Sequence, residues 1–293
     1  MKLIECGVAV LALLLLAAPL QAEPLQAAPV KLWETDGFKG PESALPVPAE
    51  GFAYVSNIAG KPSEKNGKGF ISKVTLDAGK IIELEWAKGL NAPKGLALAN
   101  GLLYAADIDQ LVAIDTKTGK IAARYAAPSA KFLNDVAADG AGRVYVSDSA
   151  TSTIWRLADG TFEKWLDSKE LNNVNGLLAQ GDKLIIAPWG KRREDGSAEP
   201  ARLLEVSLKD KTIRPLGNGE PIGNLDGIEP LDDSTYLVTE FMGGGLYRVD
   251  ASGAAKLVLD LDQSTADIGY VRASRTVLIP MLRKDKLLAY RLQ

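Results

Sequence analysis

Apolar and polar residues alternate over short segments along most of the chain, and turn residues separate these segments. Between residues 95 and 126 the segments are GLALA, LLYAAD, LVAID and IAARYA, with NG, DQ and KTGK at the breaks. Between residues 135 and 166 they are DVAAD, RVYVSD, TIWRLA and TFEKWL. Such alternation, broken by Gly, Asp and Asn, is typical of half-buried antiparallel strands. The pattern therefore predicts an all-β protein.

The groups of four segments repeat with a period near forty residues. We call the residue at which each group begins its marker position, and successive markers lie 52, 40, 41, 51 and 41 residues apart. A period of this length with several short strands predicts the blade of a β-propeller. We therefore expect a six-bladed β-propeller, since an open sandwich does not explain why polar residues return at one phase. The markers are Glu42, Lys94, Asn134, Asn175, Asp226 and Asp267.

The last group contains only three segments, IGYVRA, TVLIPML and LLAYRL. The N-terminal segment PVKLWET, Pro29 to Thr35, is predicted to supply the missing outer strand of blade six. Pairing the two ends of the chain would close the ring and remove an exposed sheet edge. Residues 29–293 are thus expected to form a single propeller domain, preceded by a short lead over residues 23–28.

The first 22 residues are typical of an export signal. Lys2 supplies the positive start, Val8 to Leu16 form an apolar run, and Ala22 is a small residue suited to cleavage. The run is too short for a stable membrane span, and nothing later in the chain approaches one. A periplasmic or secreted protein is expected, with no membrane association beyond the signal segment.

Composition removes several classes of function. The 293 residues contain no histidine, and the only cysteine, Cys6, lies in the signal segment. Ser-His-Asp catalysis, cysteine nucleophiles and imidazole ligation of zinc or copper are therefore excluded in their usual forms. The formal net charge is −3, and the sequence contains no long run of basic residues. Nucleic-acid binding is therefore not expected. The size and composition are those of an ordinary globular protein, and a monomer is expected.

Four markers of blades one, three, four and five carry side-chain oxygen, and a radial arrangement of the blades would bring them together on the axis. They are Glu42, Asn134, Asn175 and Asp226. Calcium takes six to eight oxygen ligands from carboxylates, amides and water, and two carboxylates balance one divalent cation. Magnesium or manganese remain alternatives. Each asparagine alone could instead be a turn residue that caps its own backbone. The occurrence of all four residues at the equivalent position of their repeats favours a calcium site.

The stretches around these markers resemble the gluconolactonase/regucalcin/senescence-marker-protein superfamily, which includes the paraoxonases and diisopropylfluorophosphatase. The resemblance rests on GPES, NDVAADGAGRVYVSD, NGLLAQGDKLIIAPW and LDGIEPLDDSTYLVTE, and it extends in blade order over the mature chain. It implies a six-bladed propeller with an axial calcium that hydrolyses lactones, esters or organophosphates. The positions that match the family's metal ligands are Glu42, Asn134, Asn175 and Asp226. In some members the equivalent of Asn134 contacts substrate or a metal-bound water instead.

The residues are consistent with that chemistry. A calcium ion would polarise a lactone or ester carbonyl, and Asn134 would orient that carbonyl. Asp226 would act as the general base on water or as the nucleophile itself. The alternative is a non-catalytic propeller that binds a small ligand or a protein partner, because propellers serve many unrelated functions. Lys94 among the markers and the absence of histidine favour that alternative.

Several further residues are candidates for the site. Lys94 could bind a substrate anion, pair with Asp267, take the place of the metal, or extend into water. Asp267 with Glu229 could hold a second, structural calcium lower in the tunnel, as in some relatives. Phe132 and Trp189 could form an apolar wall for the substrate.

Two insertions and a set of acidic strand ends complete the predictions. The segments Asn57 to Phe70 and Pro188 to Arg202 lie between the second and third strands of their blades. In a four-stranded antiparallel blade, that connection lies on the same face as the start of the first strand. Both loops should therefore overhang the marker site. Asp107 and Asp148, which end second strands, are expected to be structural turn caps.

Overall fold

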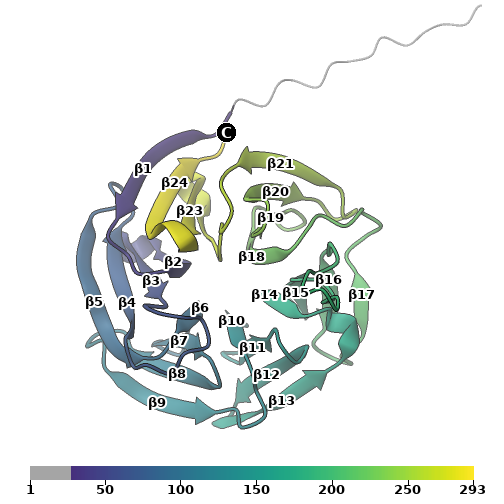
Figure 1. Ribbon diagram of the computed structural model, residues 1–293, viewed down its shortest axis with the longest axis horizontal. Helices are drawn as coiled ribbons and strands as arrows, with labels where there is room; N and C mark the ends of the chain where they lie inside the picture. The colour runs from purple at the N-terminus through teal and green to yellow at the C-terminus, as the bar shows by residue number, and fades with distance from the viewer. Residues whose placement is uncertain (1–27) are drawn as a thin grey trace, which may run out of the picture.

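The computed structural model describes residues 28–293 as six four-stranded antiparallel sheets. Figure 1 shows the sheets arranged as a ring, with their first strands near the centre and their fourth strands on the rim. The predicted all-β, six-bladed propeller is confirmed. The export signal predicted for residues 1–22 and nearly all of the lead lie outside the described residues.

The strands of the first three blades follow one another along the chain, with a 3-10 turn, η1 (Pro48–Glu50), after the first strand. Blade one is β2 (Pro41–Val47), β3 (Phe52–Asn57), β4 (Gly69–Thr75) and β5 (Ile81–Leu90). Blade two is β6 (Pro93–Ala99), β7 (Leu102–Asp107), β8 (Gln110–Asp115) and β9 (Ile121–Ala126). Blade three is β10 (Leu133–Ala138), β11 (Val144–Asp148), β12 (Thr153–Ala158) and β13 (Thr161–Asp167).

Blades four to six continue the same order, and three further 3-10 turns connect their strands: η2 (Lys169–Leu171), η3 (Arg272–Ser274) and η4 (Leu282–Lys284). Blade four is β14 (Val174–Gln180), β15 (Lys183–Pro188), β16 (Leu204–Ser207) and β17 (Ile213–Pro215). Blade five is β18 (Leu225–Pro230), β19 (Tyr236–Glu240), β20 (Gly245–Val249) and β21 (Ala255–Asp260). Blade six is β22 (Gly269–Val271), β23 (Thr276–Met281), β24 (Lys286–Arg291) and β1 (Val30–Asp36).

Strand β1 closes the ring as predicted. It pairs antiparallel with β24, from Val30 opposite Arg291 to Asp36 opposite Lys286. In Figure 1 the purple start of the described chain therefore lies beside its yellow end. The C-terminal strand gains a partner on each side, so no long sheet edge is left unpaired at the junction.

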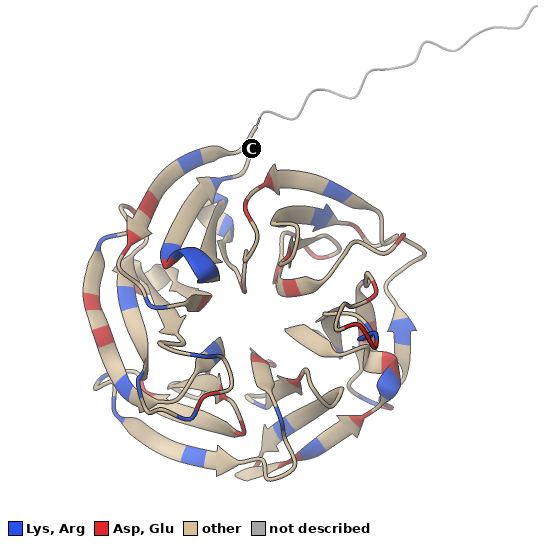
Figure 2. Cartoon of the chain, in the orientation of Figure 1, with Lys and Arg blue, Asp and Glu red and all other residues tan. Residues whose placement is uncertain are grey.

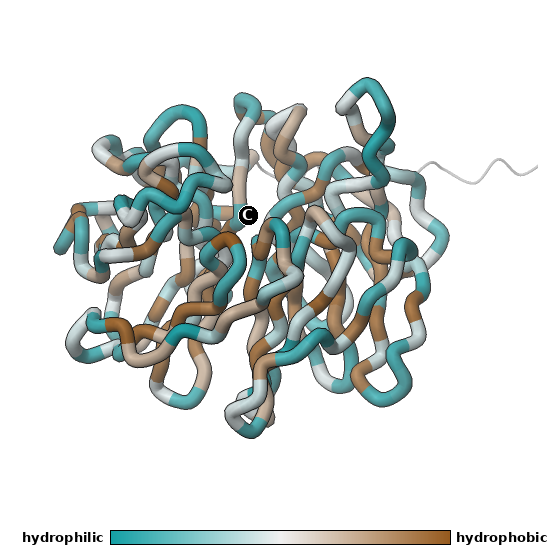
Figure 3. The backbone as a smooth tube through the Cα atoms, turned by 60° about the horizontal axis from the view of Figure 1, so that its bottom comes forward, coloured by the Kyte–Doolittle hydropathy of each residue, from teal (hydrophilic) through white to brown (hydrophobic). Residues whose placement is uncertain are grey.

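Six apolar clusters of the core each lie between two neighbouring blades, and a small seventh cluster is formed by Ile58, Ala92 and Ile108. The second strands β3, β7, β11, β19 and β23 are almost entirely buried, whereas β9 alternates between exposed and half-buried residues. The charged residues accordingly lie mainly toward the rim in Figure 2, and in Figure 3 the hydrophobic segments lie between polar loops. Apolar burial on both faces of each blade holds the ring together.

A polar residue that ends the second strand holds the entry to the first strand in several blades. The Asp107 carboxylate accepts from the backbone N–H groups of Asn91 and Ala92. The Asp148 carboxylate accepts from the N–H groups of Lys131 and Phe132. The predicted role of Asp107 and Asp148 as structural caps is confirmed. These caps fix the direction in which each first strand enters the centre of the ring.

Candidate functional site

The register of each blade defines its marker position. The first residue of the first strand pairs with the last residue of the second strand, and the marker follows immediately. These pairs are Pro41 with Asn57, Pro93 with Asp107, Leu133 with Asp148, Val174 with Pro188, and Leu225 with Glu240. Glu42, Lys94, Asn134, Asn175 and Asp226 therefore occupy equivalent positions, as the sequence spacing predicted.

In blade six the predicted marker is wrong by one residue. Thr265 pairs with Met281 through an isolated bridge, so the equivalent position is Ala266. Asp267 lies one step further along the strand and forms a parallel bridge to Ser43. Its backbone N–H donates to the carbonyl oxygen of Glu42 at 2.9 Å. Sequence spacing could not detect this shift for two reasons. Strand β22 is short, and Asp267 itself was used to define the marker position of blade six.

A register shift follows the first pair in each of the first five blades. Such a bulge disturbs the normal alternation of side chains. Two successive residues of β2 and of β10 therefore line cavities on the axis. We call Glu42, Lys94, Asn134, Asn175 and Asp226 the upper ring, and Ser43, Asp135 and Asp267 the lower ring.

The upper ring lies at the base of a cavity of about 270 Å³, which we call the axial cavity. Phe132 and Trp189 also line it, so all seven residues predicted for the main site come together. The remaining lining residues are Ile58, Pro62, Ser149, Arg192, Phe241, Leu282 and Arg283. Ile58 and Pro62 belong to one long loop, and Trp189 and Arg192 to the other. Both insertions overhang the markers as predicted.

Hydrogen bonds connect three members of the upper ring. The Asn134 amide donates to Oδ1 of Asn175, which also faces the Ser149 hydroxyl. The Asn175 amide donates in turn to Oδ1 of Asp226 and to the carbonyl oxygen of Leu225, both at 3.0 Å. Glu42 Oε2 and Asn134 Oδ1 are buried and have no hydrogen-bond partner. Unpaired buried oxygens are costly, so these two atoms are available to interact with water or a ligand in the cavity.

The pKa values of the two carboxyl groups in the upper ring are strongly raised. Burial raises the pKa of Glu42 well above its usual range, and the neighbouring charges of Asp226 and Asp267 raise it further. Burial and Asp267 together raise the pKa of Asp226 to about 8, although the hydrogen bond from Asn175 opposes this change. Buried acidic groups with shifted pKa values are characteristic of binding and catalytic sites. A cation placed between them would stabilise their ionised forms.

Lys94 is the one residue of the upper ring whose side chain carries no oxygen. Its side chain is only 1% exposed, so the option that it extends into water is wrong. The Nζ atom donates to the carbonyl oxygen of Ala92 at 2.9 Å and lies 4.5 Å from the centre of the Phe132 ring. Burial lowers the pKa of Lys94 to about 8, while the charges of Glu42 and Asp107 oppose the change. The ammonium thus partly balances the charge of the ring.

The lower ring faces a smaller cavity of about 110 Å³ further along the first strands. Asp267 accepts from the Ser43 hydroxyl at 2.5 Å, and Asp135 accepts from the N–H of Leu177 at 2.6 Å. Glu229 lines the same cavity. Burial raises the pKa of Asp267 to about 7, and burial with the charge of Asp267 raises that of Glu229 to about 8. The structure therefore brings together the two residues considered for a second metal, and adds Asp135.

Sequence reasoning missed several residues of these cavities. Asp135 directly follows the marker Asn134. It lines the lower cavity because of the bulge between Leu133 and Val136, which the sequence pattern did not indicate. Arg192 lies in the long loop Pro188 to Arg202, which the sequence predicted, but no sequence pattern indicated that its side chain lines the cavity. Phe241 and Arg283 lie after second strands, where blade repeats carry no fixed residue type. Phe241 packs on Trp189 with ring centres 5.5 Å apart, and the Arg283 guanidinium lies 5.4 Å from the Phe241 ring centre.

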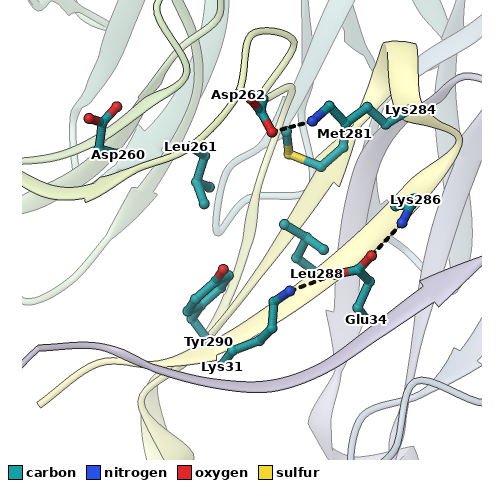
Figure 4. Close-up of a pocket in the computed structure, with 10 residues that line it drawn as sticks. All are labelled: Lys31, Glu34, Asp260, Leu261, Asp262, Met281, Lys284, Lys286, Leu288 and Tyr290. Carbon is teal, nitrogen blue, oxygen red and sulfur yellow. Dashed lines mark hydrogen bonds and ion pairs between the residues drawn. The ribbon is translucent and has the colours of Figure 1, made fainter.

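A larger hollow of about 440 Å³ lies where β1 and β24 meet blade five, and we call it the blade-six groove. Figure 4 shows that Lys31 and Lys286 face Glu34 and that Lys284 faces Asp262, whereas Asp260 lies apart. Glu34 accepts from Lys31 and Lys286, both at 2.5 Å, and Lys284 pairs with Asp262. These pairs are partly exposed and already satisfied, so the groove does not require a ligand.

Two further properties of residues 28–293 bear on the site. No helix in this part of the chain is long and apolar enough to cross a membrane. No three Asp, Glu, His or Cys side chains in it are grouped so as to hold a metal ion. Any cation at the upper ring would therefore depend on the oxygens of Asn134 and Asn175 as well as on the two carboxylates.

Neither a protein-family model nor a curated protein sequence matches the chain. Solved structures share its fold. A gluconolactonase from Xanthomonas campestris aligns with a TM-score of 0.64 and 15% identity, over 88% of each chain. A protein proposed to be a gluconolactonase aligns with a TM-score of 0.65 and 16% identity, over 92% of this chain and 93% of its own.

A streptogramin B lyase aligns nearly as well, with a TM-score of 0.61 and 12% identity over 89% of this chain and 97% of its own. These similarities show a shared fold, and the six sheets of this chain agree with the architecture that the family resemblance implied. At such identities they do not transfer an activity, because one fold serves many reactions. The function must be inferred from the site.

Proposed function

We propose that the protein is a calcium-dependent hydrolase of a lactone or a related ester. The observation that carries this proposal is the upper ring, where two buried carboxylates and two amides meet at the base of one cavity. The fold shared with gluconolactonases supports the same reaction class. The proposed substrate is a small molecule, and the proposed location is periplasmic or secreted.

The donor set of the upper ring fits calcium. Glu42, Asn134, Asn175 and Asp226 offer oxygen only, which suits a hard cation, and water or substrate would complete its coordination. The two unpartnered buried oxygens, Glu42 Oε2 and Asn134 Oδ1, belong to this set. Magnesium or manganese would use the same oxygens. Glu229 and Asp267 are the proposed ligands of a second, structural cation at the lower cavity, where water would have to supply further oxygens.

A bound divalent cation would supply the positive charge that polarises a carbonyl. The protein's own groups would perform the remaining tasks. Asn134 would orient the carbonyl group through its amide, and Asn175 holds Asp226 in place by donating to its Oδ1. Asp226 would take a proton from water as general base or attack the carbonyl as nucleophile. Phe132 and Trp189 would exclude water from one side of the substrate.

The experiment is pH-stat hydrolysis of aldono-, γ-, δ- and aryl-lactones by the mature protein, with calcium and then with a chelator. We expect turnover that disappears with the chelator and returns with calcium. Asn175→Ala should remove both this turnover and the rise in melting temperature that calcium causes. A folded protein that hydrolyses none of these lactones would favour the second candidate, a non-catalytic propeller that binds a small ligand or protein partner. The buried Lys94 in the ring is the observation that favours this second candidate.

A further inference from the structure

The lining of the axial cavity carries more positive than negative formal charge. Lys94, Arg192 and Arg283 line the cavity, whereas Glu42 and Asp226 are its only acidic lining residues in the described part of the chain. One positive charge is therefore in excess, and a divalent cation in the upper ring would raise the excess to three. A neutral sugar lactone gains nothing from such a field, but an anionic substrate is attracted and retained by it.

The two arginines are free to bind a ligand. Arg192 reaches the cavity from the loop between β15 and β16, and Arg283 reaches it from η4. Both residues are exposed, and neither guanidinium forms an ion pair within residues 28–293. The Arg283 guanidinium packs against the Phe241 ring, which limits its movement while its N–H groups stay available. Guanidinium groups bind carboxylates and phosphates through paired hydrogen bonds.

Apolar side chains form much of the wall of the cavity. Ile58, Phe132, Trp189, Phe241 and Leu282 line it together with the buried acidic residues and the exposed arginines. A ligand that fills this space would place an apolar or ring portion against the wall, with one end at the upper ring and the other at the arginines.

We infer that the substrate is an anionic lactone or ester whose carboxylate or phosphate is bound by Arg192 and Arg283, while its carbonyl lies at the upper ring. This inference rests on the proposed hydrolase function and adds the class of substrate. The two anions share the chemistry that an arginine pair recognises, so the test includes both.

The test compares matched substrates with calcium present. One pair is a γ-lactone with a carboxylate side chain and the same lactone as its carboxamide. The other pair is a phosphorylated aldonolactone and its unphosphorylated form. We expect kcat/KM to favour the anion by about tenfold or more in at least one pair. The pair that shows the preference identifies the anion as carboxylate or phosphate.

Variants then assign the preference to the two arginines. In R192Q/R283Q the ratio of kcat/KM for the charged over the neutral substrate should fall to near one. Arg193→Gln is the matched control, because Arg193 lies in the same loop but does not line the cavity, and it should keep the ratio. Equal kcat/KM within both pairs, or a preference that survives in R192Q/R283Q, overturns the inference.

A separate measurement distinguishes failure of the inference from failure of the hydrolase proposal. If no lactone is hydrolysed, the hydrolase proposal fails, and calorimetry still measures binding of the ring-opened hydroxy acids. The form that carries the second anionic group should bind more tightly than its carboxamide or unphosphorylated form, and R192Q/R283Q should remove that difference. Equal affinity of wild type for the forms of each pair would overturn the inference.

Discussion

The axial cavity and the blade-six groove are both hollows lined by charged residues, but their charges differ in burial and pairing. In the groove, Glu34 lies between Lys31 and Lys286 at the surface, where water already solvates each group. In the cavity, Glu42 and Asp226 are buried, and Glu42 Oε2 has no partner. Exposed paired charges contribute little, whereas buried unpaired charges are costly unless a ligand compensates them. We therefore propose the smaller hollow as the functional site, although the groove is larger.

The most severe test of this contrast is Asp226→Asn. The substitution keeps the shape of the side chain but removes the charge and the proposed base or nucleophile. We expect kcat/KM on a lactone to fall by about 10²–10⁴-fold, together with loss of the calcium-induced rise in melting temperature. The pH-stat and thermal melts with calcium or chelator measure both effects. A variant with the wild-type calcium shift would remove Asp226 from the proposed ligand set.

A second test changes the spacing of the ring without changing its chemistry. A Cβ at Gly176 would overlap the carbonyl oxygen of Asp226 on the neighbouring first strand. Gly176→Ala should therefore push β14 and β18 apart and lower the free energy of unfolding by about 1–3 kcal/mol. Gly140→Ala is the control, because a Cβ there meets nothing within 4 Å and its backbone is unstrained. Urea unfolding of both variants measures the effect. Equal unfolding midpoints for Gly176→Ala and Gly140→Ala would mean that the ring tolerates the extra methyl group.

A third test concerns the charge of Lys94. Its ammonium shares the upper ring with the proposed cation, so Lys94→Met removes a repulsion while nearly keeping the volume. We expect calcium to bind roughly tenfold more tightly to this variant. Calorimetry with calcium measures the change. Weaker or unchanged calcium binding would show that Lys94 does not oppose a cation at this site.

The smallest effect is expected in the groove. The hydrogen bond from Lys286, followed by that from Lys31, lowers the pKa of Glu34 to about 2. Such a depressed pKa stabilises the folded protein at neutral pH, and this contribution is lost as the pH falls toward 2. Because the groups are exposed, Glu34→Gln should change the melting temperature at pH 7 by less than about 2 °C and leave activity unaltered. A large loss of activity would mean that the groove is not merely structural.

Much of the fold could be predicted because blade repeats leave a strong periodic signal. Alternation identified the strands, the period of about forty identified the blades, and the three-strand final group indicated closure by the N-terminal segment. Equivalent residues of radial repeats converge, so five of the six markers were placed correctly. The roles of Glu42, Asn134, Asn175 and Asp226 as calcium ligands stay a prediction.

The remaining features depend on interactions between blades and loops. Asp267 lies one residue past its predicted position because pairing with β23 and β2 sets the phase of that strand. Lys94 is buried because Phe132 and the Ala92 carbonyl receive its ammonium, which no local pattern encodes. Arg192 and Arg283 line the same cavity only because a long loop and a short turn converge there. The sequence by itself determined the repeated strands and the polar residue at each repeat start, since both follow from local periodicity. Tertiary structure decided which charges are buried, which are paired and which line the axial cavity, because those depend on neighbours far apart in the chain.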